Sequence, residues 1–316
     1  MIKLAEEIIN GKRLKRGDDL SFFGNCDLEQ LCRGADMIRR KLCGDKVDLC
    51  SIINGKSGRC SENCKFCAQS GCSHTGIDEY SFLDEETILA ECRHNEQNGV
   101  HRFSIVTAGR TLSDSDFEKA VSAYSRMKSE CKIELCASHG LLTDEQFGRL
   151  HDIGIRRYHA NIETSRRFFP SICTTHTYDD KIACIKRAQS AGLEVCSGGI
   201  IGMGETFSDR TDMAVSLSEL GIVSVPINAL RPVKGTPFQD IPPITEDEIL
   251  RTAAMFRYIL PTANIRLAAG RNMMRDSGKR AFHSGVNATI TGDMLTTSGN
   301  NTKQDIAMLK EQGFEV

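Results

Sequence analysis

Residues 102–137, RFSIVTAGRTLSDSDFEKAVSAYSRMKSECKIELCA, contain the pattern that decides the fold. An apolar run, Arg102–Ala108, is followed by an amphipathic stretch, Ser113–Glu130, and then by a second apolar run, Ile133–Ala137. Short runs that are mostly apolar are typical of strands buried on both faces, and a serine before acidic residues is a typical start of a helix. The order strand, helix, strand predicts a parallel βαβ unit.

The same alternation extends over most of the chain. The apolar runs lie at Val47–Ile53, Arg102–Ala108, Ile133–Ala137, Ile155–Ile162, Leu193–Ile201, Val223–Leu230, Ile265–Ala269 and Asn287–Thr291. Helical patterns lie between them, at Asp84–Asn98, Ser113–Glu130, Thr143–Ile153, Tyr178–Ala191, Ser208–Leu220 and Thr245–Ile259. Eight such runs favour an α/β fold that closes into a (β/α)8 barrel of the TIM type over an open doubly wound sheet.

Composition narrows the class of protein. The 316 residues are 40% hydrophobic, and 40 basic and 42 acidic residues give a net charge of −2. The sequence has no cluster of basic residues, so it does not predict a nucleic-acid partner. It also has no run of about 18 apolar residues, so it does not predict a membrane span. The first residues, MIKLAEEIINGKRLKRG, lack the apolar core of a signal peptide and predict an amphipathic helix. We expect a cytoplasmic protein with a helical extension over 1–45 and a barrel over 46–316, in a single domain overall.

Fourteen cysteines require an explanation in such a protein. Clustered cysteines in a reducing compartment more often bind metal than form disulfides. Active sites of TIM-type barrels lie at the carboxyl ends of the strands, and several cysteines follow the predicted strands there. The segments at these ends are NGKSGRC, TAGR, CASHG, NIETS, CSGGIIGMGET, INALRPVKGT and AAGR.

The loop after the first strand has the strongest metal-binding pattern. Gly58–Ser70 reads GRCSENCKFCAQS, in which Cys60, Cys64 and Cys67 have the spacing C-x3-C-x2-C. Three thiolates can hold three corners of a 4Fe–4S cluster and leave its fourth iron open, as S-adenosylmethionine (SAM) requires. A zinc site completed by Cys72 or His74 is the alternative.

These motifs resemble known families. C-x3-C-x-aromatic-C after the first strand of a barrel resembles the radical SAM superfamily, with Phe66 placed for an adenine contact. Further matches, in order from about Cys50 to the C-terminus, resemble the biotin synthase family: ELCASHGLL, NIETS, TTHTYDD, VCSGGIIGMGET, SVPINAL, VKGTP, IRLAAGR and GDMLTT. The resemblance implies that two SAM-derived radicals abstract hydrogens from C9 and C6 of dethiobiotin. Sulfur from an auxiliary iron–sulfur cluster then closes the ring of biotin, without a protein acid or base.

The resemblance also implies the ligands of this auxiliary cluster. The family usually supplies three strand cysteines and an arginine, and this sequence offers Cys136, Cys196 and Arg266. On the second strand, however, Ser104 stands where the family has its remaining cysteine. A serine oxygen is a poor substitute for a thiolate on iron.

We expect another cysteine to replace the missing ligand. Cys173, in the loop after the fourth predicted strand, is the first candidate and Cys72 the second, whereas Cys50 is expected in the barrel core. The alternative is that Cys173 is a buried loop residue without a role. A third thiolate at the barrel mouth would favour a four-iron cluster carrying an extra sulfide, with 2Fe–2S as the alternative. The other cysteines are expected to be structural: Cys26, Cys32, Cys43, Cys92, Cys131 and Cys184.

The remaining contacts are also implied by resemblance. SAM is expected to contact Phe66, Gln69, Asn161, Glu163, Lys181 and Gly202. Asn161 and Asn228 are expected to bind dethiobiotin, Asn228 through the ureido ring. The family usually has aspartate at Glu163, and often arginine at Lys181. His159 stands where asparagine is common, which puts its substrate contact in doubt.

Two other functions remain open at this point. Another radical SAM barrel, such as a hydrogenase maturase or a methylornithine-type mutase, would not need Cys136, Cys196 and Arg266 together. A non-catalytic iron–sulfur or zinc carrier would not cleave SAM. The glycines of Gly199–Glu205 lack the partner residues of a dinucleotide site and are expected to let the backbone approach SAM, with Glu205 at the rim. The resemblance further implies a flavodoxin- or ferredoxin-type electron donor and a homodimer.

Overall fold

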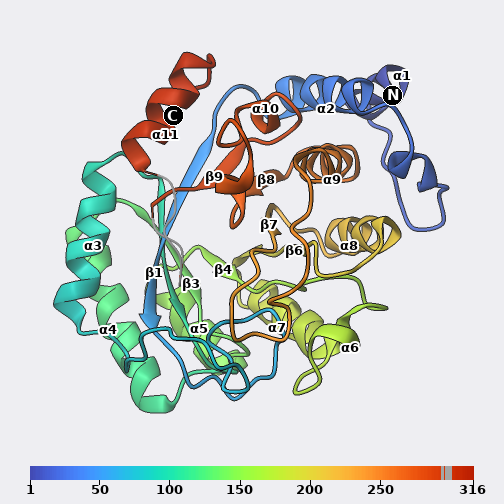
Figure 1. Cartoon of the computed structure of the whole chain (residues 1–316). Coiled ribbons are helices and arrows are strands. Elements are labelled where there is room, and N and C mark those ends of the chain that lie inside the picture. The colour runs from blue at the N-terminus through green and yellow to red at the C-terminus, as the bar shows by residue number, and fades with distance from the viewer. Residues whose placement is uncertain (293–294, 296–300) are drawn as a thin grey trace.

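The strands of the protein form one parallel, closed barrel (Figure 1). The computed structural model describes residues 1–292, 295 and 301–316. The strands are β1 (Asp48–Lys56), β2 (Arg102–Thr107), β3 (Glu134–Ser138), β4 (Arg157–His159), β5 (Glu194–Cys196), β6 (Gly199–Ile201), β7 (Ser224–Ala229), β8 (Asn264–Leu267) and β9 (Ala288–Ile290). Their order is β5-β4-β3-β2-β1-β9-β8-β7-β6, and pairing of β5 with β7 closes the ring. The predicted (β/α)8 barrel is confirmed.

One predicted strand, 193–201, is divided into β5 and β6, which both pair with β7. The division follows from a close approach of two backbones, because a Cβ on Gly198 would lie 2.0 Å from the carbonyl oxygen of Pro226. Glu163 takes up the hydrogen bonds there: its N–H donates to the Gly198 carbonyl at 3.1 Å and its carbonyl accepts from Ile200 N–H at 2.8 Å. β5 and β6 together therefore act as one of the eight barrel strands.

The helices surround this barrel (Figure 1). The predicted ones are α3 (Glu85–Gln97), α4 (Asp114–Glu130), α5 (Asp144–Asp152), α7 (Tyr178–Ser190), α8 (Phe207–Glu219) and α9 (Glu246–Ile259). The predicted capping box at Thr143 is present, since its hydroxyl accepts from Gln146 N–H at 3.2 Å and the Gln146 side chain accepts from Thr143 N–H at 3.0 Å. Further helical segments are α6 (Phe169–Ile172), α10 (Lys279–Phe282), α11 (Thr302–Glu311) and the 3-10 turn η2 (Arg271–Met273).

The chain before the barrel is helical, as expected. It contains α1 (Ile2–Ile9), the 3-10 turn η1 (Ser21–Gly24) and α2 (Leu28–Leu42). Helix α2 packs against α9, so this segment lies on the outside of the barrel. Among the described residues, no helix has the length and apolar character needed to cross a membrane. The division of the chain at residue 45 stays a prediction.

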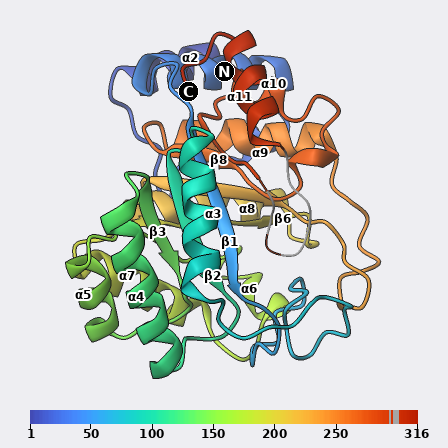
Figure 2. The same cartoon turned by 90° about the vertical axis from the view of Figure 1, so that its left-hand side faces the viewer.

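The long loop after β1 lies beside α6 in both views (Figures 1 and 2). Lys65 in this loop donates its backbone N–H to the carbonyl of Ile172, the last residue of α6, at 2.9 Å. Because β1 and β4 are parallel, their following loops meet at the same end of the barrel. This contact brings the C-x3-C-x2-C segment against the loop that carries Cys173.

Candidate active site

A cavity of about 410 Å³ occupies the barrel and opens at the carboxyl ends of its strands. Ten of the predicted site residues line it: Phe66, Cys67, Gln69, Cys136, Asn161, Glu163, Lys181, Cys196, Asn228 and Arg266. The other four lie outside its lining: Cys60, Cys64, Cys173 and Gly202. The barrel therefore brings together residues from most of the predicted strand ends.

The three cysteines of the first predicted site lie in one closed turn. Cys60 donates its N–H to the Gln69 carbonyl at 3.2 Å, and its own carbonyl accepts from Gly71 N–H at 2.8 Å. Cys67 donates its N–H to the Cys64 carbonyl at 3.1 Å. Burial raises the pKa of the Cys67 thiol to about 11, and the neighbouring Cys60 adds to the rise. Binding of a metal by Cys67 would therefore have to displace the proton of its thiol.

Three cysteines gather deep in the cavity, on three different strands. They are Cys50 on β1, Cys136 on β3 and Cys196 on β5. Burial raises the pKa of Cys136 to about 12, and the next largest cause is the charge of Cys50. Burial also opposes ionisation of Cys196, but a hydrogen bond and charge from His159, together with the charge of Arg266, lower its pKa to about 7. All three cysteines and Arg266 line the same cavity.

The placement of Cys50 corrects the expectation that it belongs to the barrel core. In the register of the sheet it pairs with Arg102 on β2 and with Ile290 on β9, and all three line the cavity. Strand periodicity contained this signal: Cys50 and Ile52 are two residues apart and so face the same side. Ile52 pairs with Ser104, the serine that replaces the family's cysteine. Cys50 is the next residue towards the start of β1 that faces the same side as Ile52.

Ser104 lies where the missing ligand was expected. It is buried, lines the cavity and pairs with Cys136 across β2 and β3. Its hydroxyl oxygen is fully buried without a hydrogen-bond partner in the described chain. A buried hydroxyl left unpaired costs free energy, so this orphaned group indicates that the cavity accommodates a bound group beside it.

Below the cavity, Asp48 holds three arginines, a feature that sequence reasoning missed. Arg266 donates Nη2–H to the Asp48 carboxylate at 2.7 Å, and Arg102 donates Nε–H at 3.3 Å. The Arg157 guanidinium lies 3.6 Å from the same oxygen. Burial raises the pKa of Asp48, but the three cations outweigh burial and hold it below its usual value. Asp48 therefore fixes the Arg266 side chain at the cavity wall.

Two asparagines face the cavity from its rim. Asn161 accepts from Gly198 N–H at 3.0 Å and donates to Glu163 at 3.3 Å. Asn228 accepts from Ala269 N–H at 3.1 Å and donates to the Gly199 carbonyl at 3.1 Å. An amide has two N–H groups and two oxygen lone pairs. Each side chain is thus fixed by the backbone and retains one donor and one acceptor for a ligand.

Gly202 does not line the cavity, although a SAM contact was expected there. Its N–H donates at 2.8 Å to Glu205, whose carboxylate is paired with Arg210 at 2.7 Å. Glu205 is buried rather than placed at a rim. Gly202 has a φ of +88°, and a Cβ there would lie 1.9 Å from Cγ2 of Ile244. The glycine is needed for the turn after β6 and for packing.

We predict that Gly202→Ala costs more stability than Gly221→Ala. Both glycines have positive φ, but a Cβ on Gly221 meets nothing within 4 Å. The difference between the two losses of unfolding free energy therefore measures the clash with the branched side chain of Ile244. Overpacking of this kind costs about 1–3 kcal/mol. Urea denaturation of the two variants measures it. Equal losses would show that Gly202 is not needed for packing.

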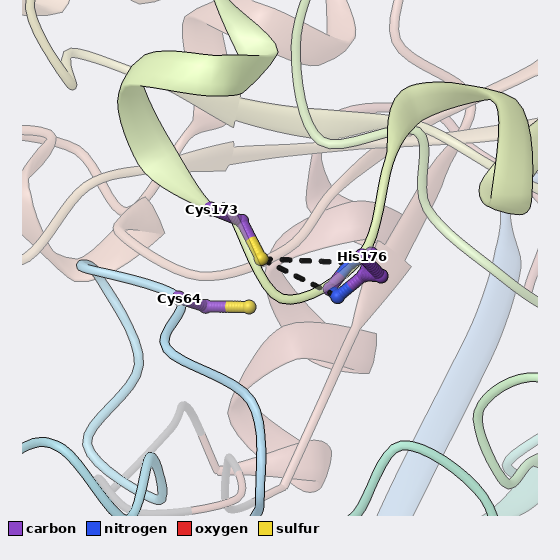
Figure 3. Close-up of side chains that lie close together, drawn as sticks. All are labelled: Cys64, Cys173 and His176. Carbon is purple, nitrogen blue, oxygen red and sulfur yellow. Dashed lines mark hydrogen bonds between the residues drawn. The ribbon is translucent and has the colours of Figure 1, made fainter.

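Cys173 lies outside the lining of the cavity that contains Cys136 and Cys196, and its role as an auxiliary-cluster ligand stays a prediction. It lies buried at the end of α6, where its sulfur is grouped with the sulfur of Cys64 and the ring of His176 (Figure 3). The hydrogen bond from Lys65 N–H to the Ile172 carbonyl joins the first cysteine loop to the end of α6, next to Cys173. Cys72, the second candidate, is exposed and lies outside the cavity lining.

Comparison with known proteins gives consistent matches. The family model of the radical SAM superfamily matches residues 56–217, and that of the biotin and thiamin synthesis associated domain matches 226–315. The chain is 66% identical over 314 residues to the biotin synthase of Alkaliphilus metalliredigens, which covers 99% of each chain. It is 64% identical over 316 residues to the biotin synthase of Clostridium beijerinckii, which covers 100% of each.

Solved structures agree on the fold. A crystal structure of methylornithine synthase superposes with a TM-score of 0.85 at 19% identity, covering 99% of this chain and 96% of that chain. A maturase of the [FeFe]-hydrogenase has a TM-score of 0.83 at 18% identity, covering 99% and 74%. At such low identity these likenesses show the fold alone.

Proposed function

The chain belongs to the biotin synthase family of radical SAM enzymes, and from that premise we propose which of its residues perform the reaction. The activity is the SAM-dependent insertion of sulfur into dethiobiotin to form biotin. When bound, a 4Fe–4S cluster with SAM supplies the radical, and an auxiliary iron–sulfur cluster supplies the sulfur. The protein's own residues bind these groups and orient the substrate.

The first cluster is proposed to bind Cys60, Cys64 and Cys67. The support is that one hydrogen-bonded turn holds these soft donors and that Cys67 lines the cavity. No fourth cysteine belongs to this motif, so one iron is left for SAM. Beside it, Phe66, Gln69, Glu163 and Lys181 line the same cavity and are proposed to contact SAM.

The observation that carries the auxiliary site is that Cys50, Cys136, Cys196 and Arg266 all line one cavity. We propose that Cys50 replaces the ligand that Ser104 cannot supply, and that Cys173 is not a ligand there. Three thiolates and one guanidinium suit iron, because thiolates are soft donors. The guanidinium is held by Asp48 and by the Thr289 carbonyl, to which Nη1–H donates at 2.8 Å.

For its composition, we propose a four-iron cluster with an extra sulfide, with 2Fe–2S as the alternative. The support is the unpaired Ser104 hydroxyl, which faces the cavity beside Cys136. A hydroxyl is a hydrogen-bond donor and suits a sulfide at the position that a family cysteine would fill. Iron and acid-labile sulfide counts on protein without the first cluster distinguish the two compositions.

Dethiobiotin is proposed to bind between the two clusters. Asn228 retains one donor and one acceptor, which matches the N–H and C=O groups of a ureido ring. Asn161 has the same capacity and lies next to Glu163, so it suits a position between SAM and substrate.

We keep a flavodoxin- or ferredoxin-type protein as the proposed electron donor, because each SAM cleavage consumes one electron. The homodimer stays a prediction from the family resemblance.

The experiment is a product assay on reduced, anaerobically reconstituted enzyme with SAM and dethiobiotin. We expect biotin, with about two 5′-deoxyadenosine molecules for each biotin, since two hydrogens are abstracted by cofactor radicals. Cys67→Ala should produce neither product. Formation of 5′-deoxyadenosine without biotin would indicate a different radical SAM reaction, and the absence of both from the unsubstituted enzyme would indicate a carrier.

A further inference from the structure

Polar side chains flank the Cys196 sulfur from two neighbouring strands. In the register of the sheet, Cys196 on β5 pairs with His159 on β4 and with Ser224 on β7. All three residues line the barrel cavity. The Cys196 sulfur lies 3.4 Å from the Ser224 hydroxyl oxygen, and the His159 ring also hydrogen bonds to this sulfur. Each of the two strands thus places one hydrogen-bonding group beside the same thiol.

The other two cysteines of the cavity differ from Cys196 in this respect. The Cys50 thiol donates to the backbone carbonyl of Ser51 at 3.6 Å. Burial raises the pKa of Cys50 to about 11 and that of Cys136 to about 12. Burial also opposes ionisation of Cys196, but the hydrogen bond from His159 is the largest of the effects that lower its pKa to about 7. Within the described chain, Cys196 is therefore the only one of the three with two side chains hydrogen bonded to its sulfur.

The direction of these hydrogen bonds depends on the state of the sulfur. The Cys196 thiol donates to the Ser224 oxygen. A thiolate that binds iron has no proton, so it can only accept hydrogen bonds. A serine hydroxyl both donates and accepts, and a neutral imidazole carries one N–H. Among the residues that the structure describes, neither the His159 ring nor the Ser224 hydroxyl hydrogen bonds to any group but Cys196, so both can donate to its sulfur.

We propose that His159 and Ser224 donate hydrogen bonds to the Cys196 sulfur when it binds the auxiliary cluster, and that these bonds raise the reduction potential of that cluster. Hydrogen bonds to the sulfurs are among the factors that set such potentials. They stabilise the reduced cluster more than the oxidised one, because the reduced cluster carries more negative charge. The inference rests on the proposed function, which makes Cys196 a ligand. It assigns His159 to the cluster rather than to the substrate.

A higher potential suits the proposed reaction. When a carbon radical bonds to a sulfur held by iron, one electron of the sulfur pairs with the radical electron. A second electron of the sulfur passes to a ferric iron, which becomes ferrous. The cluster must therefore accept one electron for each C–S bond that forms. His159 and Ser224 favour this step by stabilising the reduced cluster through its Cys196 ligand.

A redox titration followed by electron paramagnetic resonance tests the proposal. The full chain carries Cys60→Ala, Cys64→Ala and Cys67→Ala and is reconstituted anaerobically, so that the signal comes from the auxiliary cluster alone. At a fixed potential, His159→Leu should lower the ratio of reduced to oxidised cluster about tenfold, because it removes a hydrogen bond to a charged group. For a one-electron couple, a tenfold change is a shift of about 59 mV to lower potential.

Matched variants separate this role from a structural one. His159→Asn keeps a side-chain N–H and should recover part of the shift, whereas Ser224→Ala should shift the potential in the same direction as His159→Leu. Ser138→Ala is the control. It removes another cavity-lining hydroxyl, on a residue that pairs with Val106 rather than with a cysteine, and it should leave the potential unchanged.

Each outcome bears on a definite part of the proposal. An unchanged potential in His159→Leu with its iron retained would overturn the inference and leave the auxiliary cluster in place. If His159→Leu loses its iron, Ser224→Ala must lower the potential, and an unchanged value there contradicts the proposal. A strong nitrogen-14 hyperfine coupling that His159→Leu removes would make His159 an iron ligand, which also contradicts it. If the background protein holds no cluster, the proposed auxiliary site is wrong and this inference falls with it.

Discussion

Cys50→Ser is expected to remove the auxiliary cluster and with it biotin formation, while SAM cleavage continues. The physical reason is the loss of one of three soft donors deep in the cavity, where the Cys136 and Cys196 sulfurs lie with the Arg266 guanidinium. The measurement is iron and acid-labile sulfide in a protein that also carries Cys60→Ala, Cys64→Ala and Cys67→Ala. That background should keep about four irons in the proposed composition, and adding Cys50→Ser should remove most of them.

Two control variants make this prediction specific. Cys173→Ser should keep the residual iron, since its sulfur lies with Cys64 and His176. Ser104→Cys introduced together with Cys50→Ser should restore part of the iron, because Ser104 lines the same cavity on the neighbouring strand. Full iron content in Cys50→Ser, or its loss in Cys173→Ser, would return the ligand role to Cys173.

Asp48→Asn is expected to destabilise the fold by about 3–5 kcal/mol, as does removal of one partner from a buried ion pair. Arg266 and Arg157 are buried, and both lose their shared carboxylate. Asp179→Asn is the matched control, because it breaks an exposed carboxylate–guanidinium pair with Arg166, and such pairs contribute about 0–1 kcal/mol. Urea denaturation at neutral pH compares the two variants.

The stability lost in Asp48→Asn should become smaller as the pH falls. The arginines hold the pKa of the folded-state carboxyl below 3.8, its ordinary value. A lowered folded-state pKa gives stability that is complete above the unfolded-state pKa and is lost as pH falls through the folded-state value. The difference in unfolding free energy between the unsubstituted protein and Asp48→Asn should therefore be constant from neutral pH down to about 5 and shrink below 3.8. A difference that grows on acidification would contradict this account.

Much of the fold was predictable because its signals are local. Apolar runs, capping residues and their alternation predicted every barrel strand, and the Thr143 capping box formed as expected. The division of 193–201 into β5 and β6 was not predictable from a local pattern. It depends on the approach of Gly198 to the Pro226 carbonyl, which lies on a strand that follows later in the chain.

Site residues on strands were predictable, because the alternation of a strand determines which way they face. Residues placed by packing between distant segments were not. Cys136, Cys196 and Arg266 lie on strands and face the cavity as expected. Cys173 follows α6, and its position depends on how α6 packs against the cysteine loop, where Lys65 donates to Ile172. Cys50 was missed because it was assigned to the core, although its two-residue spacing from Ile52 already placed both on one face. Asp48 was missed because its three arginine partners come from β2, β4 and β8.

The most direct test of the two-cluster account is an anomalous-scattering map at the iron edge from anaerobic crystals of the reconstituted enzyme. We predict two separate iron peaks. One should lie against the sulfurs of Cys60, Cys64 and Cys67, and the other against those of Cys50, Cys136 and Cys196. A second peak bounded by Cys173, or iron deep in the barrel without contact to the Cys50 sulfur, would contradict the account.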